Sequence, residues 1–258
     1  MLTLRPATDS SPRERILVIG ASGAGKSYGA ATIAEACPDR TVHVIDNDAA
    51  WGRMAEHLSN VQIWEAQSWS EHVDALKAIN KTMGREDWLV VDMLSACWDL
   101  VQDHYTEQVF GESVEDYFLQ IRKQLEQQKQ NNKNLGAFDG WIDWQVINKL
   151  YRRLQLDLLK TPGHQYAIAG VQKLGDEDRK NRDITATFGP YNLRPTGQKK
   201  TAHNFHTVIL CTKTRTEQYQ LTTIKDRNRT ELTEEPITNF AKTYLRQIAG
   251  WKPRKQQG

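Results

Sequence analysis

The sequence has few cysteines and no long apolar run. Its 258 residues include three cysteines, Cys37, Cys97 and Cys211, and their spacing fits neither a metal site nor a disulfide framework. No apolar stretch approaches the roughly 20 residues of a membrane-spanning helix, and the amino-terminal residues lack the apolar core of a signal peptide. These absences argue against a disulfide-stabilised secreted protein and against a membrane partner, and they predict a cytoplasmic location.

The chain also lacks a strong charge of either sign. Its 34 Lys and Arg against 32 Asp and Glu leave a formal net charge of +2. Any nucleic-acid surface must therefore be a local patch, because the whole molecule generates no strong positive field. A hydrophobic content of 39% and a charged content of 26% are typical of a soluble globular protein, and this length is ordinary for one α/β domain.

Short apolar runs alternate with helical stretches along the chain. The predicted strands cover 16–19, 41–45, 61–64, 88–91, 166–171, 207–212 and 219–224, with the last two paired as neighbours. The predicted helices cover 27–36, 69–79 and 141–160. Continuous apolar strands separated by helices predict a mainly parallel β-sheet that is covered on both faces.

We predict one domain over residues 15–250, between an amino-terminal tail (1–14) and a basic carboxy-terminal tail (251–258). A polar stretch at about 101–140 is rich in Gln and Asn and has few apolar residues to bury. It predicts a projecting insertion or a mobile helix. Residues 175–198 show no clear period and predict a long surface loop.

Helix 141–160 carries an apolar stripe at i, i+4 spacing, which predicts a core-facing side. Its members are Ile142, Val146, Leu150, Leu154 and Leu158. Most of the eight tryptophans are assigned to core packing, and Trp51 and Trp141 are the candidates for exposed contacts.

The strongest motif, Gly-Ala-Ser-Gly-Ala-Gly-Lys-Ser, directly follows the first predicted strand. It is a complete phosphate-binding loop of the Walker A type, whose glycines let backbone N–H groups surround an anion. Lys26 would reach the β- and γ-phosphates and Ser27 would ligate Mg²⁺. The motif therefore predicts that ATP and Mg²⁺ bind here. The predicted nucleotide-binding residues are Gly20, Ala21, Ser22, Gly23, Ala24, Gly25, Lys26, Ser27 and Tyr28.

Two further acidic positions complete the predicted site. Asp92 ends the apolar run Leu-Val-Val, as in a Walker B motif, and it would hold Mg²⁺ together with Ser27. The alternative is that Asp92 only caps the next helix. Hydrolysis also needs a group that orients or deprotonates water. Asp46 and Asp48 follow strand 41–45 and are the candidates, unless they are turn or cap residues.

The chain resembles the RecA-like ATPases in the order of several short segments. Residues 45–50, with Asp48, resemble the segment that carries the catalytic acid, and 90–96 resemble the Walker B strand. Residues 168–172 resemble the strand whose terminal Gln, here Gln172, senses the γ-phosphate. The segments 197–200 and 208–210 resemble the helix and strand after the DNA-binding loop.

The segment 223–229 resembles the basic element that RecA-like proteins insert into a neighbouring subunit's ATP site. Lys225 and Arg227 occupy its two cationic positions. The resemblance covers roughly residues 15–230, and its nearest form is the compact RecA-like ATPase of bacteriophages, which acts in recombination or single-strand annealing. The catalytic residues it implies are Lys26, Asp48, Asp92, Gln172, Lys225 and Arg227.

The same resemblance implies an ATPase that binds single-stranded DNA, self-associates into a ring or filament, and acts in recombination, annealing or replication. A single-strand-binding protein is a candidate partner. Asp48 is one methylene shorter than the family's Glu, which leaves fast hydrolysis open because water positioning is sensitive to about 1 Å. The chain also lacks the additional DNA-binding domains of full-length recombinases.

Cations and aromatic rings mix within residues 179–200, a composition that suits single-stranded nucleic acid. The alternative is an ordinary charged surface loop. The predicted DNA-binding residues are Arg179, Lys180, Arg182, Phe188, Tyr191, Arg194, Lys199 and Lys200.

Three other functions stay open. The phosphate-binding loop also has the glycine spacing of small-molecule P-loop kinases, in which the Arg-rich segment 179–194 would be a lid. The chain could instead be a DNA-packaging or other nucleic-acid motor. A nucleotide-gated binding module without hydrolysis is favoured if Asp48 is not a base.

Overall fold

A computed structural model of the chain describes residues 13–127, 142–214, 216, 218–226, 235–236 and 239–246. Its centre is an eight-stranded sheet with the strand order β10-β9-β8-β1-β5-β4-β2-β3. These strands are β1 (Arg15–Gly20), β2 (Val42–Asp46), β3 (Val61–Glu65), β4 (Trp88–Asp92), β5 (His164–Ala169), β8 (Thr207–Lys213), β9 (Tyr219–Lys225) and β10 (Glu235–Pro236). The strands from β3 to β8 in this order pair in parallel, while β9 and β10 are antiparallel. The predicted mainly parallel sheet is confirmed, as is the pairing of the last two predicted strands.

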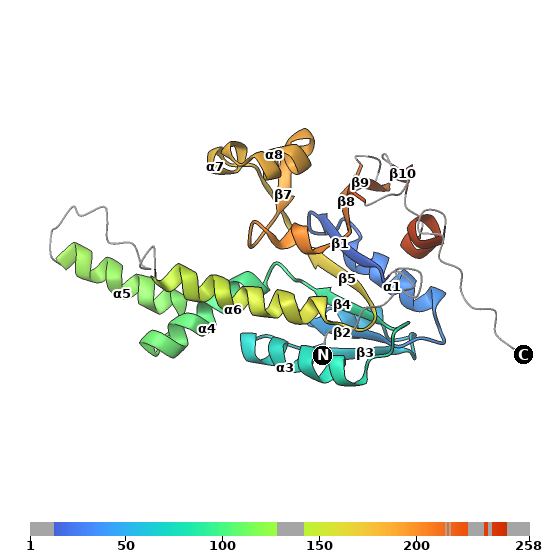
Figure 1. The fold of residues 1–258 in the computed structure, drawn as a ribbon, viewed down its shortest axis with the longest axis horizontal. Coiled ribbons are helices and arrows are strands. Elements are labelled where there is room, and N and C mark those ends of the chain that lie inside the picture. Colours follow the sequence, from blue (N-terminus) through green and yellow to red (C-terminus); the bar gives the residue numbers. More distant parts are fainter. Residues whose placement is uncertain are drawn as a thin grey trace, which may run out of the picture.

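The helices lie on both faces of the sheet and in two projections from it (Figure 1). The α-helices are α1 (Lys26–Ala36), α2 (Trp51–Met54), α3 (Trp69–Thr82), α4 (Cys97–Phe110), α5 (Val114–Gln127), α6 (Ile142–Leu159), α7 (Asp176–Lys180) and α8 (Arg182–Phe188). Two short 3₁₀ helices, η2 (Gly189–Tyr191) and η3 (Thr201–Asn204), and a π-helical segment, η4 (Ala241–Arg246), complete the described helices.

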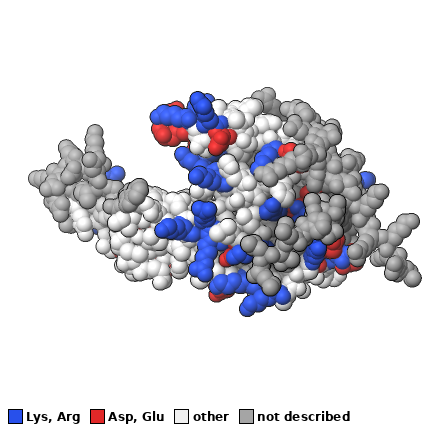
Figure 2. Space-filling model, in the orientation of Figure 1, with Lys and Arg blue, Asp and Glu red and all other residues white. Residues whose placement is uncertain are grey.

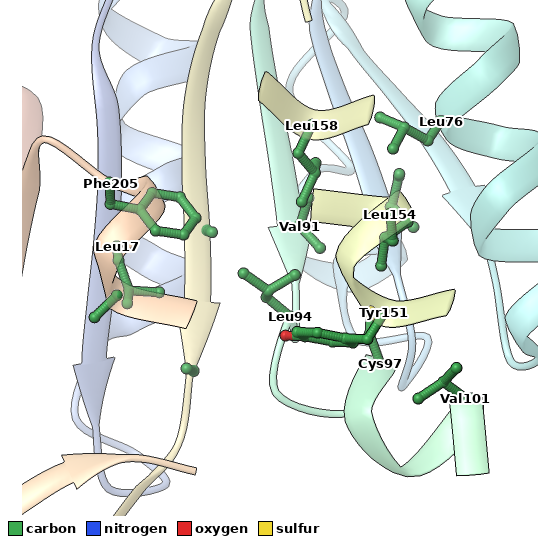
Figure 3. Close-up of a cluster of buried hydrophobic side chains, with 14 of the residues drawn as sticks. Leu17, Leu76, Val91, Leu94, Cys97, Val101, Tyr151, Leu154, Leu158 and Phe205 are labelled. Atoms are coloured by element: carbon green, nitrogen blue, oxygen red, sulfur yellow. The ribbon is translucent and has the colours of Figure 1, made fainter. Parts of the chain in front are cut away.

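Alternation along β1 divides its side chains between two cores. Leu17 and Ile19 pack into a cluster with α3, α4 and α6, whereas Ile16 and Val18 pack into a second cluster with α1 and η4. Successive side chains of a strand point to opposite faces, so an apolar run such as this is expected where helices cover both sides. Figure 3 shows part of the first cluster, where side chains of α6 point toward β4.

Helix α6 buries a different stripe from the predicted one. Its buried residues are Ile147, Tyr151, Leu154 and Leu158, whereas Ile142 is 62% and Val146 38% exposed. The amino-terminal part of α6 projects beyond the sheet beside α5 (Figure 1), so its apolar residues have no sheet beneath them. The strict i, i+4 stripe was therefore wrong for this half of the helix.

The predicted strand 166–171 is interrupted at Gly170. Strand β5 ends at Ala169, and residues 171–173 form β6, which pairs with β7 (Leu193–Pro195) in a separate two-stranded sheet. Between them lie α7, α8 and η2, so the predicted long surface loop was wrong. We call residues 171–195 the β6–β7 module; it stands out from the end of the main sheet (Figure 1).

The polar stretch predicted as an insertion at about 101–140 has two described parts. Residues 101–110 belong to α4, which buries Val101, Tyr105 and Thr106. Helix α5 begins at Val114 and projects away from the sheet (Figure 1). The last part of the predicted insertion lies outside the described residues.

Candidate nucleotide-binding site

The phosphate-binding loop joins the end of β1 to the start of α1. Gly23 and Gly25 adopt positive φ angles of 74° and 84°, a conformation that side chains with a Cβ rarely adopt. At Gly20, a Cβ atom would collide with the carbonyl oxygen of Cys211 in the adjacent strand β8. The glycines therefore serve both the turn itself and the close approach of the neighbouring strand.

Lys26 lies in a pocket of about 600 Å³ at the carboxyl edge of the parallel strands. Its ammonium donates to the Ala21 carbonyl oxygen at 2.8 Å, and the residue is only 8% exposed. Burial lowers the pKa of Lys26, while the nearby Asp92 carboxylate acts in the opposite direction. An anion in this pocket would find a cation that is positioned by the loop and partly removed from water.

Asp92 ends β4 and lines the same pocket. Its carboxylate accepts hydrogen bonds from the Ser27 hydroxyl and from the Trp51 indole nitrogen, the latter at 2.9 Å. Burial raises the pKa of Asp92, and these two hydrogen bonds partly oppose that shift. Trp51 is fully buried, so its interpretation as an exposed contact was wrong; it holds the Asp92 carboxylate in place.

The two acids after β2 have different surroundings. Asp46 is buried and accepts the backbone N–H groups of Asp48 at 3.3 Å and Trp51 at 2.9 Å. Burial raises the pKa of Asp46 despite the Trp51 hydrogen bond. Asp48 is exposed and lines the pocket. Both acids thus accept backbone N–H groups of the turn, Asp48 that of Ala50 at 3.3 Å, but of the two Asp48 is the one exposed to water at the pocket.

Another part of the pocket's lining comes from the junction with the β6–β7 module. Gly170, Val171 and Thr196 line the pocket, and the Thr196 N–H donates to the Gly170 carbonyl oxygen at 3.0 Å. Gln172 is half-buried in β6, paired in register with Arg194, and is not among the lining residues of the described chain. The predicted sensor position therefore adjoins the pocket rather than facing it.

Residues 13–245 match the family model described as the AAA domain. The chain belongs to the AAA domain family. Its α/β P-loop NTPase fold, predicted from the loop and strand pattern, is confirmed by this match and by the sheet. Proteins of this fold bind nucleotide and usually use Mg²⁺.

Comparisons with individual proteins add little to the family match. A search of curated proteins found no match. Among solved structures, the RadB recombinase is similar to this AAA domain with a TM-score of 0.49 and 13% sequence identity, over 84% of this chain and 83% of that chain.

Two side chains at the phosphate-binding loop have oxygen atoms that suit Mg²⁺ as ligands. Ser27 and Asp92 bring a hydroxyl and a carboxylate oxygen together at the loop, and hard oxygen ligands of this kind suit Mg²⁺, which retains waters and phosphate oxygens as its other ligands. A bound Mg²⁺ would neutralise phosphate charge. Within the described residues, no group of three or more His, Cys, Asp or Glu could hold a metal by itself.

A second pocket, of about 480 Å³, adjoins the first at Gly25, Tyr28 and Tyr219. Its other lining residues include Tyr166 and Phe240, so its walls are mainly aromatic. Tyr28 and Tyr219 are 53% and 38% exposed. A flat apolar group that is attached to a phosphate chain in the first pocket can lie against these rings.

Lys225 lies at the opposite end of β9 from Tyr219, and the strand between them spans about 20 Å. Its ammonium donates to the carbonyl oxygens of Ala202 at 3.1 Å and Phe205 at 2.8 Å. Lys225 therefore cannot reach the nucleotide pocket of its own chain. Arg227, its predicted companion, lies outside the described residues.

The residues predicted to bind DNA divide into buried and exposed groups. Phe188 is 4% and Arg194 8% exposed, and the Arg194 Nε donates to an Asp178 carboxylate oxygen at 2.8 Å. These two side chains pack within the module, so little of either is open to a ligand. Tyr191 is half-buried against the core. The exposed cations are Arg179, Lys180, Arg182, Lys199 and Lys200.

The sequence pattern did not identify Trp51 and Thr196 as residues at the nucleotide pocket. Trp51 follows Asp48 in a segment without an apolar strand or a long helix, so no periodicity marks it as buried. Thr196 reaches the pocket only because β7 returns beside β6.

No described helix of the domain is long and apolar enough to cross a membrane.

Proposed function

We propose that this AAA domain is a RecA-like ATPase that hydrolyses ATP and binds single-stranded DNA, in recombination, annealing or replication of the bacteriophage type. The observation that carries the ATPase part is the convergence of Lys26, the Ser27–Asp92 pair and Asp48 on one pocket. Lys26 would hold the β- and γ-phosphates. Asp48 would orient or deprotonate the attacking water, because its carboxylate is the exposed one beside the pocket.

The aromatic pocket next to the loop supports a nucleoside triphosphate as the substrate. Tyr28 and Tyr219 would contact the base while the phosphates lie on the loop. We expect Tyr219→Ala to raise the Michaelis constant for ATP more than it lowers the rate at saturation. This result would follow from a lost contact with the base, which takes no part in the chemistry.

Phosphate release measured with and without single-stranded DNA tests the proposed reaction. We expect Lys26→Ala to lose roughly 10²- to 10³-fold in rate, the usual cost of removing one positioned donor from a developing charge. Lys81→Ala, an exposed lysine on α3, is the matched control and should hydrolyse ATP like the wild type. Transfer of phosphate to a small acceptor, without any effect of DNA, would instead support the kinase alternative.

We further propose a ring or filament in which Lys225 and Arg227 act on the ATP of a neighbouring copy. The position of Lys225, at the end of β9 far from its own pocket, is consistent with this arrangement. Asp92→Ala and Arg227→Ala subunits, each inactive alone, should recover activity when mixed, because some interfaces then carry both intact groups. Failure of the mixture to recover activity would remove the support for a shared site.

We propose a single ATPase unit over residues 15–250 between two tails, acting in the cytoplasm, with a single-strand-binding protein as a candidate partner. The three cysteines are buried and their spacing fits no disulfide framework, which supports a reducing compartment.

A further inference from the structure

A second polar cavity lies apart from the nucleotide pocket, between α4, α6, α8 and the segment that follows β7. It has a volume of about 440 Å³. We call it the cationic trough; its lining includes Trp98, Asn148, Asp183, Lys199, Lys200 and His203. Asp183 is the one carboxylate among the described lining residues, so the trough favours an anionic ligand.

Trp98 gives the trough an aromatic wall. The residue is half-buried and lines the cavity, and its ring is held by neighbours on α6. Trp144 stacks on it with a centroid distance of 6.2 Å and an interplanar angle of 12°, and Tyr151 meets it edge-on at 5.2 Å and 88°. A ring fixed in this way offers a planar group a contact at little cost in side-chain entropy.

Helix α6 extends the positive charge beyond the trough. Asn148 lines the trough, and Gln155, seven residues later, donates to the Thr201 hydroxyl at 3.4 Å. Arg152 is four residues after Asn148 and therefore lies on the same face of the helix. It is exposed. Figure 2 shows Lys and Arg side chains gathered in a band on this face of the molecule, from the region of α7 and α8 down over α6.

The trough also adjoins a further cavity. A neighbouring cavity of about 320 Å³ shares Asp183, Lys199 and His203 with it and reaches Lys225. Two adjoining cavities and a band of cations form an extended surface, which suits a chain of phosphates better than one small anion. Cations beside a stacking ring are the recurring arrangement for single-stranded nucleic acid.

We propose that single-stranded DNA binds along the cationic trough, with phosphates on Lys200 and Arg152 and a base against Trp98. The proposal rests on the DNA binding proposed above and moves it from the module's outer face to this cavity. Thr196 lines the nucleotide pocket and Gly197 lines the trough, so the strand would lie one residue from the ATP site wall.

Fluorescence anisotropy with a labelled oligo-dT tests the proposal on the full chain. The double variant Arg152→Ala/Lys200→Ala should bind roughly tenfold or more weakly at about 0.1 M salt. Its plot of log affinity against log salt should lose about 1.4 in slope, because each phosphate contact with a single strand contributes about 0.7. The matched control, Arg122→Ala/Lys123→Ala, removes one exposed Arg and one exposed Lys from α5 and should bind like the wild type.

The stacking contact needs its own variant. Trp98→Leu should bind roughly fivefold to a hundredfold more weakly, whereas Trp98→Phe should retain most of the affinity. Circular dichroism checks the fold of each. If Trp98→Leu does not fold, ultraviolet cross-linking of the wild type to a bromouracil oligonucleotide replaces it, and the cross-linked peptide should contain Trp98.

Three outcomes would overturn the proposal. If the wild type binds oligo-dT and both sets of trough variants bind equally well, the trough is not the site, while DNA binding itself stands. If the charge variant weakens binding but Trp98→Leu does not, and no cross-link maps to Trp98, the stacking contact is wrong. If the wild type binds no oligo-dT with or without ATP, the DNA-binding part of the proposed function fails as well.

Discussion

The nucleotide pocket and the β6–β7 module both combine cations with glycines and aromatic rings, but they use them differently. In the pocket, Lys26 and the backbone of the loop face a cavity. In the module, Arg194 pairs with Asp178, and the Phe188 ring packs into the core. Burial alone would raise the pKa of Asp178, yet Arg194, the Gly175 N–H and Lys199 together hold it below its ordinary value.

The difference is that the Arg194 guanidinium is already paired within the protein, whereas the Lys26 ammonium lines a cavity that a ligand can enter. The module is too small to bury a large apolar core, and its buried ion pair contributes to joining α7 to β7. The pocket instead tolerates a buried Lys26 whose close partner is a single backbone carbonyl. Variants in the module should therefore mainly change its stability, whereas variants in the pocket should also change the rate of ATP hydrolysis.

The largest expected loss of stability is in the module. Arg194→Met leaves a buried carboxylate at Asp178, and breaking such a pair costs about 3–5 kcal/mol. We expect faster hydrogen exchange and proteolysis within residues 171–195, while the main sheet stays protected. The double variant Arg194→Met/Asp178→Leu also removes the carboxylate that has lost its Arg194 partner, and it should recover much of the loss. Equal protection of the module in wild type and Arg194→Met would contradict a structural role for the pair.

The next effect is expected at the nucleotide pocket. Trp51→Phe removes the indole N–H that Asp92 accepts, and a buried acceptor that loses its donor costs about 1–3 kcal/mol. Urea unfolding should show this loss together with slower ATP hydrolysis. Trp64→Phe is the matched control, because Trp64 is 37% exposed on the edge strand β3. A Trp51→Phe protein with unchanged hydrolysis would show that Asp92 needs no such support.

A smaller effect should separate packing from DNA contact at Phe188. Phe188→Leu replaces one buried apolar side chain with another and should cost about 1 kcal/mol in the free energy of unfolding. Its affinity for oligo-dT should match that of the wild type, because Phe188 is only 4% exposed. A loss of affinity without a loss of stability would restore Phe188 as a stacking residue.

The smallest effect on stability should be a gain, and it should depend on pH. Burial raises the pKa of Asp92 in the folded protein. The free energy of unfolding therefore falls once the pH rises above the pKa that this carboxyl has in the unfolded chain. Asp92→Asn should therefore raise the melting temperature at about pH 7, and the gain should shrink toward about pH 4 as the wild-type carboxyl is protonated. Asp176→Asn, at an exposed acid on α7, should show no such trend. If the melting temperatures of Asp92→Asn and the wild type differ by the same amount at every pH, ionisation of Asp92 is not the cause of the gain.

Much of the fold could be predicted because its signals are local. The glycines that adopt positive φ, the lysine that starts α1 and the acid that ends β4 each lie within a short window. The apolar runs of β1 and β4 predict buried parallel strands in the same way. The predicted loop 175–198 failed because its helices are short, and neither α7 nor α8 is long enough to show a helical period.

The amino-acid sequence by itself determined that a phosphate-binding loop lies between a buried strand and a helix, since neighbouring residues make that structure. Only the tertiary structure decided which charged groups are available to a ligand. Asp46 and Asp48 are two residues apart, yet Asp46 is buried and Asp48 is exposed at the pocket. Likewise Arg194 and Lys200 both line the trough, yet Arg194 is 8% exposed and paired with Asp178, whereas Lys200 is exposed. Burial and partners depend on chain segments that are far apart in the sequence, which local patterns do not encode.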